Sequence, residues 1–97
     1  MFLIIYTDSA LEDISASRKS ELTTIFDRVD EQLMYHPDVI TWNRKRLRPN
    51  ETAEWELRID DFRVLYDIDF DERNVEVKVV GVKQGARLLV RGTEFLL

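Results

Sequence analysis

The chain has 97 residues, 44% of them hydrophobic, with no cysteine and a formal net charge of −5. This length supports one small hydrophobic core, so we expect residues 1–97 to form a single domain. The lack of cysteine excludes disulfides and thiolate metal sites, and the acidic charge excludes a protein that coats nucleic acid indiscriminately. The apolar start MFLIIY is too short for a signal sequence or a membrane span, so we expect a cytoplasmic protein with no membrane contact.

The beginning of the chain predicts a strand followed by a short helix. The segment FLIIYT (2–7) is short, β-branched and aromatic, and polar residues follow it, which is typical of a buried strand. Ser9 is followed three residues later by Glu12, the spacing of a capping box. We therefore expect a helix of one or two turns with Leu11 and Ile14 facing inward.

A longer helix is predicted from about Ser17 to Tyr35. Its apolar residues follow a 3.6-residue period along one stripe: Leu22, Ile25, Phe26, Val29 and Leu33. Pro37 should end this helix at about His36, because the residue before a proline is disfavoured in helical geometry. His36 is the only histidine, and with no nucleophile or ligand beside it we interpret it as an exposed helix-end residue. Residues 38–53 are expected to form a connection.

Three antiparallel strands are predicted next, over residues 53–60, 62–70 and 74–82. Asp60-Asp61 is a candidate two-residue turn between the first two, and DERN (71–74) is a longer turn before the third.

The C-terminal segment RLLVRGTEFLL places Arg91-Gly92 between two apolar runs, which favours a closing β-hairpin. The segment GVKQG (81–85) lacks the features of a phosphate-binding loop and is interpreted as a turn. Together these elements predict an α+β fold: an N-terminal strand, two helices, a three-stranded antiparallel meander and a C-terminal hairpin.

If Asp60-Asp61 closes the first hairpin, the cross-strand pairs can be counted. One face is then entirely apolar and suited to a core: Ile59 with Phe62, Leu57 with Val64, and Trp55 with Tyr66. The other face is mostly charged: Arg58 with Arg63, Glu56 with Leu65, and Glu54 with Asp67. The register set by the turn agrees with the register that burial requires.

Two arginines opposite each other repel, at a cost of up to about 1 kcal/mol. Two interpretations of Arg58 and Arg63 stay open at this point. The pair belongs to an ordinary solvated face on which Glu56, Asp60 or Asp61 offsets the repulsion. Alternatively, it binds an anion such as a phosphate, for which the guanidinium is the best donor.

A basic run, RKRLR (44–48), precedes this hairpin. It holds four of the fourteen basic residues, so the rest of the chain is more acidic than the average: Arg44, Lys45, Arg46 and Arg48. A basic stripe on an acidic body indicates an anionic partner.

The order of these elements, with WELRIDDFRVLYDID (55–69) followed by VVGVK (79–83), resembles the RelE/ParE toxin superfamily of bacterial type II toxin–antitoxin systems. The resemblance covers nearly the whole chain. It implies a cognate antitoxin as partner and no small-molecule cofactor or metal. Ribosome-dependent members of the superfamily cut messenger RNA, whereas others inhibit DNA gyrase.

The resemblance also implies roles for individual residues. Arg63 matches the arginine that grips the scissile phosphate, Arg58 matches a basic position on the preceding strand, and Lys83 stands where relatives have a transition-state arginine. The basic run 44–48 matches an RNA-binding segment. Counting from the DERN turn, however, places Lys83 opposite Phe62 on the apolar face, unless Gly81 breaks the alternation of the strand.

Two positions depart from the pattern of the relatives. Glu56 occupies a basic position, and about Leu89 the chain lacks the tyrosine of the best-known ribonucleases. From the resemblance as a whole we expect a toxin that acts as a metal-independent, ribosome-dependent mRNA endonuclease and inhibits translation, with the ribosome and mRNA as partners, although the two departures favour the first alternative. The alternatives are a ParE-like gyrase inhibitor or catalytically silent binding member, and, second, a small housekeeping interaction domain.

Overall fold

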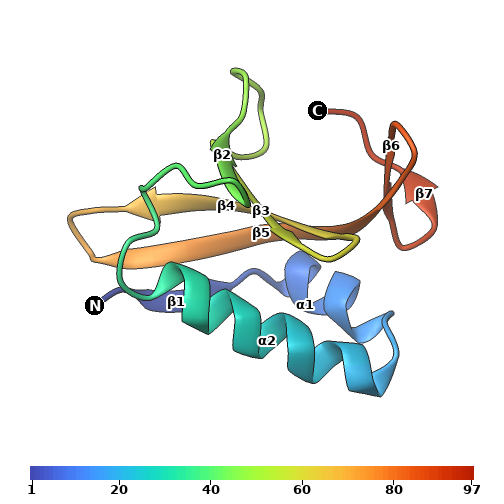
Figure 1. The fold of residues 1–97 in the computed structure, drawn as a ribbon, viewed down its shortest axis with the longest axis horizontal. Coiled ribbons are helices and arrows are strands. Elements are labelled where there is room, and N and C mark those ends of the chain that lie inside the picture. Colours follow the sequence, from blue (N-terminus) through green and yellow to red (C-terminus); the bar gives the residue numbers. More distant parts are fainter.

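The structure, a computed structural model, describes all 97 residues as two helices and one mixed sheet (Figure 1). The elements in chain order are β1 (Leu3–Tyr6), α1 (Asp8–Ser15), α2 (Lys19–Leu33), β2 (Arg44–Arg46), β3 (Trp55–Ile59), β4 (Phe62–Asp69), β5 (Asn74–Gln84), β6 (Arg87–Val90) and β7 (Thr93–Glu94). Neither helix has the length and apolar character needed to cross a membrane. The predicted α+β class and the order of strand, helices and meander are confirmed.

The sheet has the order β2-β3-β4-β5-β6-β7, and β1 joins it by parallel pairing with the first part of β5. The predicted meander is β3-β4-β5. The predicted C-terminal hairpin is also present as β6 and β7, with Arg91 and Gly92 at φ 52° and 81° in its turn. Strand β2 was not predicted, because it lies inside the segment 38–53 that was expected to be a connection.

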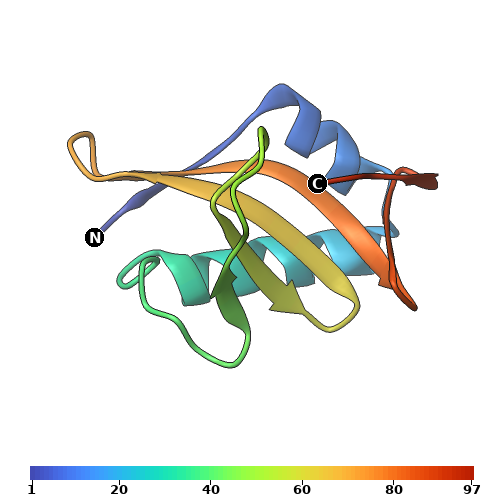
Figure 2. The same cartoon turned by 90° about the horizontal axis from the view of Figure 1, so that it is seen from above.

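Both helices pack on one face of the sheet, as Figures 1 and 2 show from two sides. The predicted stripe of α2 is confirmed: Ile25, Val29 and Leu33 are buried, and Leu22 and Phe26 are partly buried against the same core. The helix is shorter than predicted, since Arg18 caps its start and Met34 its end.

Helix α1 begins earlier than its predicted cap. The hydroxyl of Thr7, not Ser9, accepts a hydrogen bond from the Ala10 N–H at 3.0 Å. Leu11 is exposed, so its predicted inward position was wrong, while Ile14 is buried as predicted.

The main core lies between the helices and the inner face of the sheet. The apolar side of the meander β3-β4-β5 faces it as predicted, with Ile68 partly buried and five residues buried: Trp55, Leu57, Val64, Tyr66 and Val77. The predicted pairs of β3 and β4 are present, including Arg58 opposite Arg63.

A second, smaller cluster lies on the other side of the sheet. It consists of Ala53, Leu65, Val79 and Leu88, with Leu47, Val90 and Phe95 packed against it. We call the face that carries it the outer face. The loop before β3 and the β6–β7 hairpin both rise on this side in Figure 1. The outer face is therefore partly covered, and not a flat solvated surface.

The register of β5 differs from the prediction. The turn before β5 occupies residues 70–73, one residue earlier than expected, and Asp69 pairs with Asn74. A bulge then leaves Lys78 without a cross-strand partner, because Leu65 pairs with Val79 and Tyr66 with Val77. The strand also continues to Gln84, so the interpretation of GVKQG as a turn was wrong; the turn is at Gly85 and Ala86.

Candidate nucleic-acid interface

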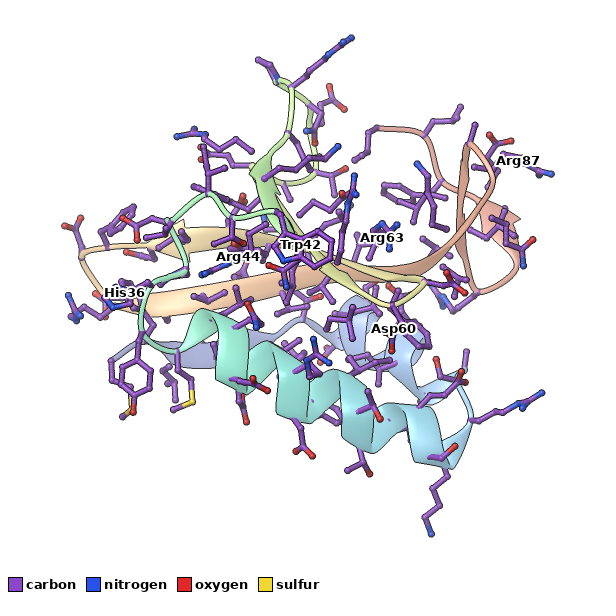
Figure 3. The ribbon with its side chains drawn as sticks, viewed as in Figure 1. His36, Trp42, Arg44, Asp60, Arg63 and Arg87 are labelled. Carbon is purple, nitrogen blue, oxygen red and sulfur yellow. The ribbon has the colours of Figure 1, made fainter.

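The paired arginines lie on the outer face, near the tip of the β3–β4 hairpin. Arg58 is exposed and Arg63 is half-buried, and their Cα atoms are direct cross-strand partners. In Figure 3, Arg63 points away from the helices, above the hairpin tip marked by Asp60. The pairing that was counted from the sequence therefore places two guanidinium groups on one accessible surface.

Lys83 shares this face with the arginines. Beyond the bulge at Lys78, Arg63 pairs with Gly81 and Phe62 with Val82. Lys83 lies two residues after Gly81, so alternation directs both to the same side of the sheet. The prediction that Lys83 faces the core opposite Phe62 was wrong. The cause is the bulge, because the earlier turn alone would leave Lys83 on the face of Phe62 and Gly81 does not break the strand.

The guanidinium of Arg63 is fixed by the hairpin turn. Its Nη1 donates to the backbone carbonyls of Asp60 and Phe62, both at 2.9 Å. Asp60 adopts a left-handed conformation at φ 52° as part of this turn. No carboxylate lies within ion-pair distance of Arg63, and its Nε and Nη2 keep N–H groups with no protein acceptor. These two atoms can present a bidentate edge to an anion.

Arg58 is in a different electrostatic position. Its Nε lies 3.7 Å from Glu56 Oε1, and Lys45 Nζ lies 3.9 Å from the same oxygen. Glu56 is only 8% exposed, so two cations share one largely buried carboxylate. The mixed-charge interpretation thus describes Arg58, whereas Arg63 and Lys83 carry positive charge without an acidic partner.

The basic run 44–48 does not form one continuous stripe, because side chains alternate along β2. Arg44 turns toward α2, where its Nη1 donates to the carbonyls of Gln32, at 3.0 Å, and His36. A cation at this helix end satisfies free carbonyls and complements the helix dipole. Arg46 pairs with Glu54 at 2.8 Å and lies over the Trp55 ring at 5.5 Å.

The other two members of the run, Lys45 and Arg48, are exposed, as Arg46 is. Lys45 lies opposite Glu56 and so belongs to the outer face with Arg58. Arg48 is exposed and forms no ion pair, in the loop that follows β2. Sequence reasoning did not separate these two from Arg44 and Arg46, since β2 and its pairing with β3 were not predicted.

The outer face holds no clear group for proton transfer. Of the two leucines near the position where relatives have tyrosine, Leu88 pairs with Lys83 and lies on this face, whereas Leu89 pairs with Val82 and points the other way. Neither side chain can carry a proton. Glu56 is the carboxylate within ion-pair distance of Arg58, and it also contacts Lys45.

The remaining titratable candidates are turned away from the arginines. The Tyr66 hydroxyl donates to the Pro37 carbonyl at 2.8 Å, and burial raises the pKa of this phenol well above its ordinary value. His36 lies beyond the C-terminal end of α2, away from Arg63 (Figure 3). No group of three or more His, Cys, Asp or Glu side chains is placed to hold a metal ion.

No protein-family model matches the chain, and a comparison with curated proteins gives no match either. Solved structures do match. The RelBE2 toxin–antitoxin complex of Mycobacterium tuberculosis aligns with a TM-score of 0.73 and 21% identity over 84% of this chain and 98% of that one. An archaeal RelE–RelB complex from Pyrococcus horikoshii OT3 gives 0.69 and 14%, covering 88% and 98%. The intact Escherichia coli RelBE complex gives 0.67 and 16%, covering 87% and 99%.

These alignments cover nearly the full length of the matched chains, so the likeness concerns the whole domain. The molecule is a small α+β domain whose fold is similar to that of chains in these complexes. More specifically, it has a RelE-like fold, which confirms at the level of the fold the resemblance carried by the hairpin sequence.

Proposed function

We propose that this chain is the toxin of a bacterial type II toxin–antitoxin system and cleaves messenger RNA on the ribosome without a metal ion. The observation that carries the proposal is the position of Arg63, Arg58 and Lys83 together on the outer face of a RelE-like sheet. Two arginines and one lysine thus lie on one face of an otherwise acidic protein. Three cations in this arrangement suit a phosphodiester better than any neutral ligand.

The reaction assigned to this site is attack of a ribose 2′-hydroxyl on the adjacent phosphorus. The P–O5′ bond breaks, leaving a 2′,3′-cyclic phosphate and a free 5′-hydroxyl, and the 2′-hydroxyl proton passes to the medium or to the leaving oxygen. Arg63 holds the non-bridging oxygens through Nε and Nη2, because its Nη1 is occupied by the hairpin carbonyls. Lys83 stabilises the charge that develops on the phosphorane.

Proton transfer is the weak part of this site. The three cations cannot accept the 2′-hydroxyl proton, and Glu56 is engaged by Lys45 and Arg58. General acid–base catalysis typically contributes about 10²- to 10⁴-fold. We therefore expect cleavage that relies on positioning and charge, and that is slower by about that factor than in an enzyme with a dedicated base.

Within the basic run, Lys45 and Arg48 are assigned to the RNA backbone. Both are exposed, and Lys45 shares the outer face with Arg58. Arg44 and Arg46 are assigned structural roles, because α2 and Glu54 respectively engage their guanidinium groups.

A cognate antitoxin is the proposed protein partner, since the similar structures are toxin–antitoxin complexes. The net charge of −5 favours a partner segment with a basic, amphipathic character. Purification from the native host should recover a small protein in stoichiometric amount. Recovery of the chain alone from cells that tolerate it would count heavily against an antitoxin.

The test of the proposed activity is induced expression followed by growth measurement and mapping of transcript ends. The wild-type chain should arrest growth and generate new 5′ ends within coding regions, and Arg63→Ala should do neither. Arg87→Ala is the matched control, because Arg87 is exposed on the remote hairpin (Figure 3) and pairs with Glu94 at 3.4 Å. Equal loss in both variants would contradict a specific role for Arg63.

A second candidate function is inhibition by binding alone, either of DNA gyrase or of another partner. The neutralisation of Arg58 by Glu56 and the absence of a free proton-transfer group favour it. Growth arrest with intact transcripts and stalled DNA replication would select this candidate. Expression with no effect on growth would leave a small interaction domain.

A further inference from the structure

Trp42 is the most exposed aromatic residue of the chain. It is 95% exposed, whereas the other tryptophan, Trp55, is 5% exposed and packs in the core. Leaving an indole in water forgoes a large gain from burial. Figure 3 shows its ring standing free in front of the sheet, with Arg44 and Arg63 to either side in that view.

The turn that presents Trp42 is held by several hydrogen bonds. Thr41 and Arg44 pair through both backbone groups, at 3.0 and 3.3 Å, with Trp42 and Asn43 between them. The Thr41 hydroxyl donates to the Asn43 side-chain oxygen at 2.7 Å. The Arg44 side chain anchors the turn to the end of α2. The backbone beneath the indole is therefore well supported, so a ligand that docks on the ring need not order it.

This turn is also joined to the candidate site. The Asn43 carbonyl accepts a hydrogen bond of 2.8 Å from the Arg58 N–H, just beyond the last pair of β2 with β3. Trp42 is thus one residue from a direct backbone contact with the strand that carries Arg58. An aromatic side chain beside a cationic phosphate site is the arrangement that single-stranded nucleic acids use for base stacking.

We propose that Trp42 stacks on an unpaired base of the bound RNA, next to the phosphate held by Arg58 and Arg63. This inference rests on the proposed function and adds a base contact to it. RNA is favoured over a protein partner, because the turn that carries Trp42 is bonded to the strand of Arg58, whose guanidinium suits a phosphate. Stacking requires only a free ring face, and the indole is 95% exposed.

The affinity of a short single-stranded oligouridylate provides the first test. Trp42→Ala should weaken binding by about 5- to 150-fold, and Trp42→Phe should retain most of the affinity. The salt dependence separates stacking from charge. Trp42→Ala should leave the slope of log K against log salt unchanged, whereas Arg58→Ala should lower its magnitude by about 1. Circular dichroism should show both variants folded, since both side chains are exposed.

Fluorescence provides the second test, because Trp55→Phe leaves Trp42 as the only indole. Oligouridylate should quench this signal and protect it from acrylamide. The proposal is overturned if wild-type protein fails to bind the oligonucleotide at low salt, or if Trp42→Ala binds equally well. It is also overturned if only the antitoxin protects Trp42. Loss of cleavage on ribosomes with stacking retained would instead refute the proposed function alone.

Discussion

Arg91 reaches from the C-terminal hairpin to α1, where its Nε lies 2.9 Å from Asp13 Oδ1. The other oxygen of Asp13 accepts a hydrogen bond of 3.1 Å from the Val80 N–H, beyond the last pair of β1 with β5. The carboxylate therefore satisfies a strand amide that has no strand beside it and ties the hairpin to the helix. Glu12 adds an exposed ion pair of 3.0 Å to Arg91.

Stability should depend on pH through Asp13. Burial raises the pKa of its carboxyl, and this outweighs the opposing effects of the Val80 hydrogen bond and the Arg91 charge. Because the folded pKa lies above the unfolded value of about 3.9, the native state binds more protons between the two values. The contribution of Asp13 to stability is thus greatest below about pH 4 and falls as pH rises to the folded pKa.

Asp13→Asn removes this titration. The free energy of unfolding of wild type relative to Asp13→Asn should decline as pH rises through that window and stay constant above it. Urea denaturation of both proteins across the acidic range measures the difference, in which the other carboxylates cancel. A difference that increases with pH would mean that the ion pair with Arg91, and not desolvation, dominates at this site.

Leu57 tests the core register of the hairpin. Its side chain is fully buried between β2 and β4, opposite Arg44 and Val64. Leu57→Ala should lower the free energy of unfolding by about 2–5 kcal/mol. Leu3→Ala is the matched control in another strand, where the side chain is exposed and the change should stay within about 0.5 kcal/mol. Similar urea midpoints for the two variants would contradict the packing of the inner face.

Lys83 tests the bulge in β5. Its neighbour Gln84 is also exposed but points to the opposite side of the strand, which makes it a matched control. Lys83→Ala should weaken transcript cleavage, whereas Gln84→Ala should leave it unchanged. Equal activity of Lys83→Ala and wild type would show that the Lys83 ammonium does not reach the scissile phosphate, although alternation places the residue on the same face as Arg63.

The fold was predictable where two independent signals agreed. In the β3–β4 hairpin, the Asp60-Asp61 turn and the alternation of apolar residues specify the same register. The start of α1 was not predictable in this way, because Thr7 and Ser9 are both good caps. The choice is made by a tertiary contact, since the Thr7 N–H bonds to the Val77 carbonyl at 3.1 Å and extends β1 up to the cap.

The candidate site was predictable in its residue types but not in its arrangement. Strand β2 has only three residues and depends on pairing with β3, so no local signal separates Arg44 from Lys45. The bulge at Lys78 depends on distant partners as well, with Asp67 at 3.1 Å from its Nζ. The only sign of the bulge in the sequence is that the adjacent residues Val79 and Val80 are both apolar. They face opposite sides of the sheet, and both are buried.

Glu56 sets the charge of the outer face, and its replacement provides the last prediction. Glu56→Gln removes the carboxylate that Lys45 and Arg58 share, so RNA phosphate no longer competes with Glu56 for either cation. RNA affinity should rise at low salt, and the slope of log K against log salt should steepen. Binding titrations of an oligonucleotide at several salt concentrations measure both effects.

If Glu56 also accepts the 2′-hydroxyl proton, the same variant would bind RNA more tightly and yet cleave it at least about 10²-fold more slowly. Tighter binding with unchanged cleavage assigns Glu56 to charge balance alone, and weaker binding would contradict the placement of the RNA on this face.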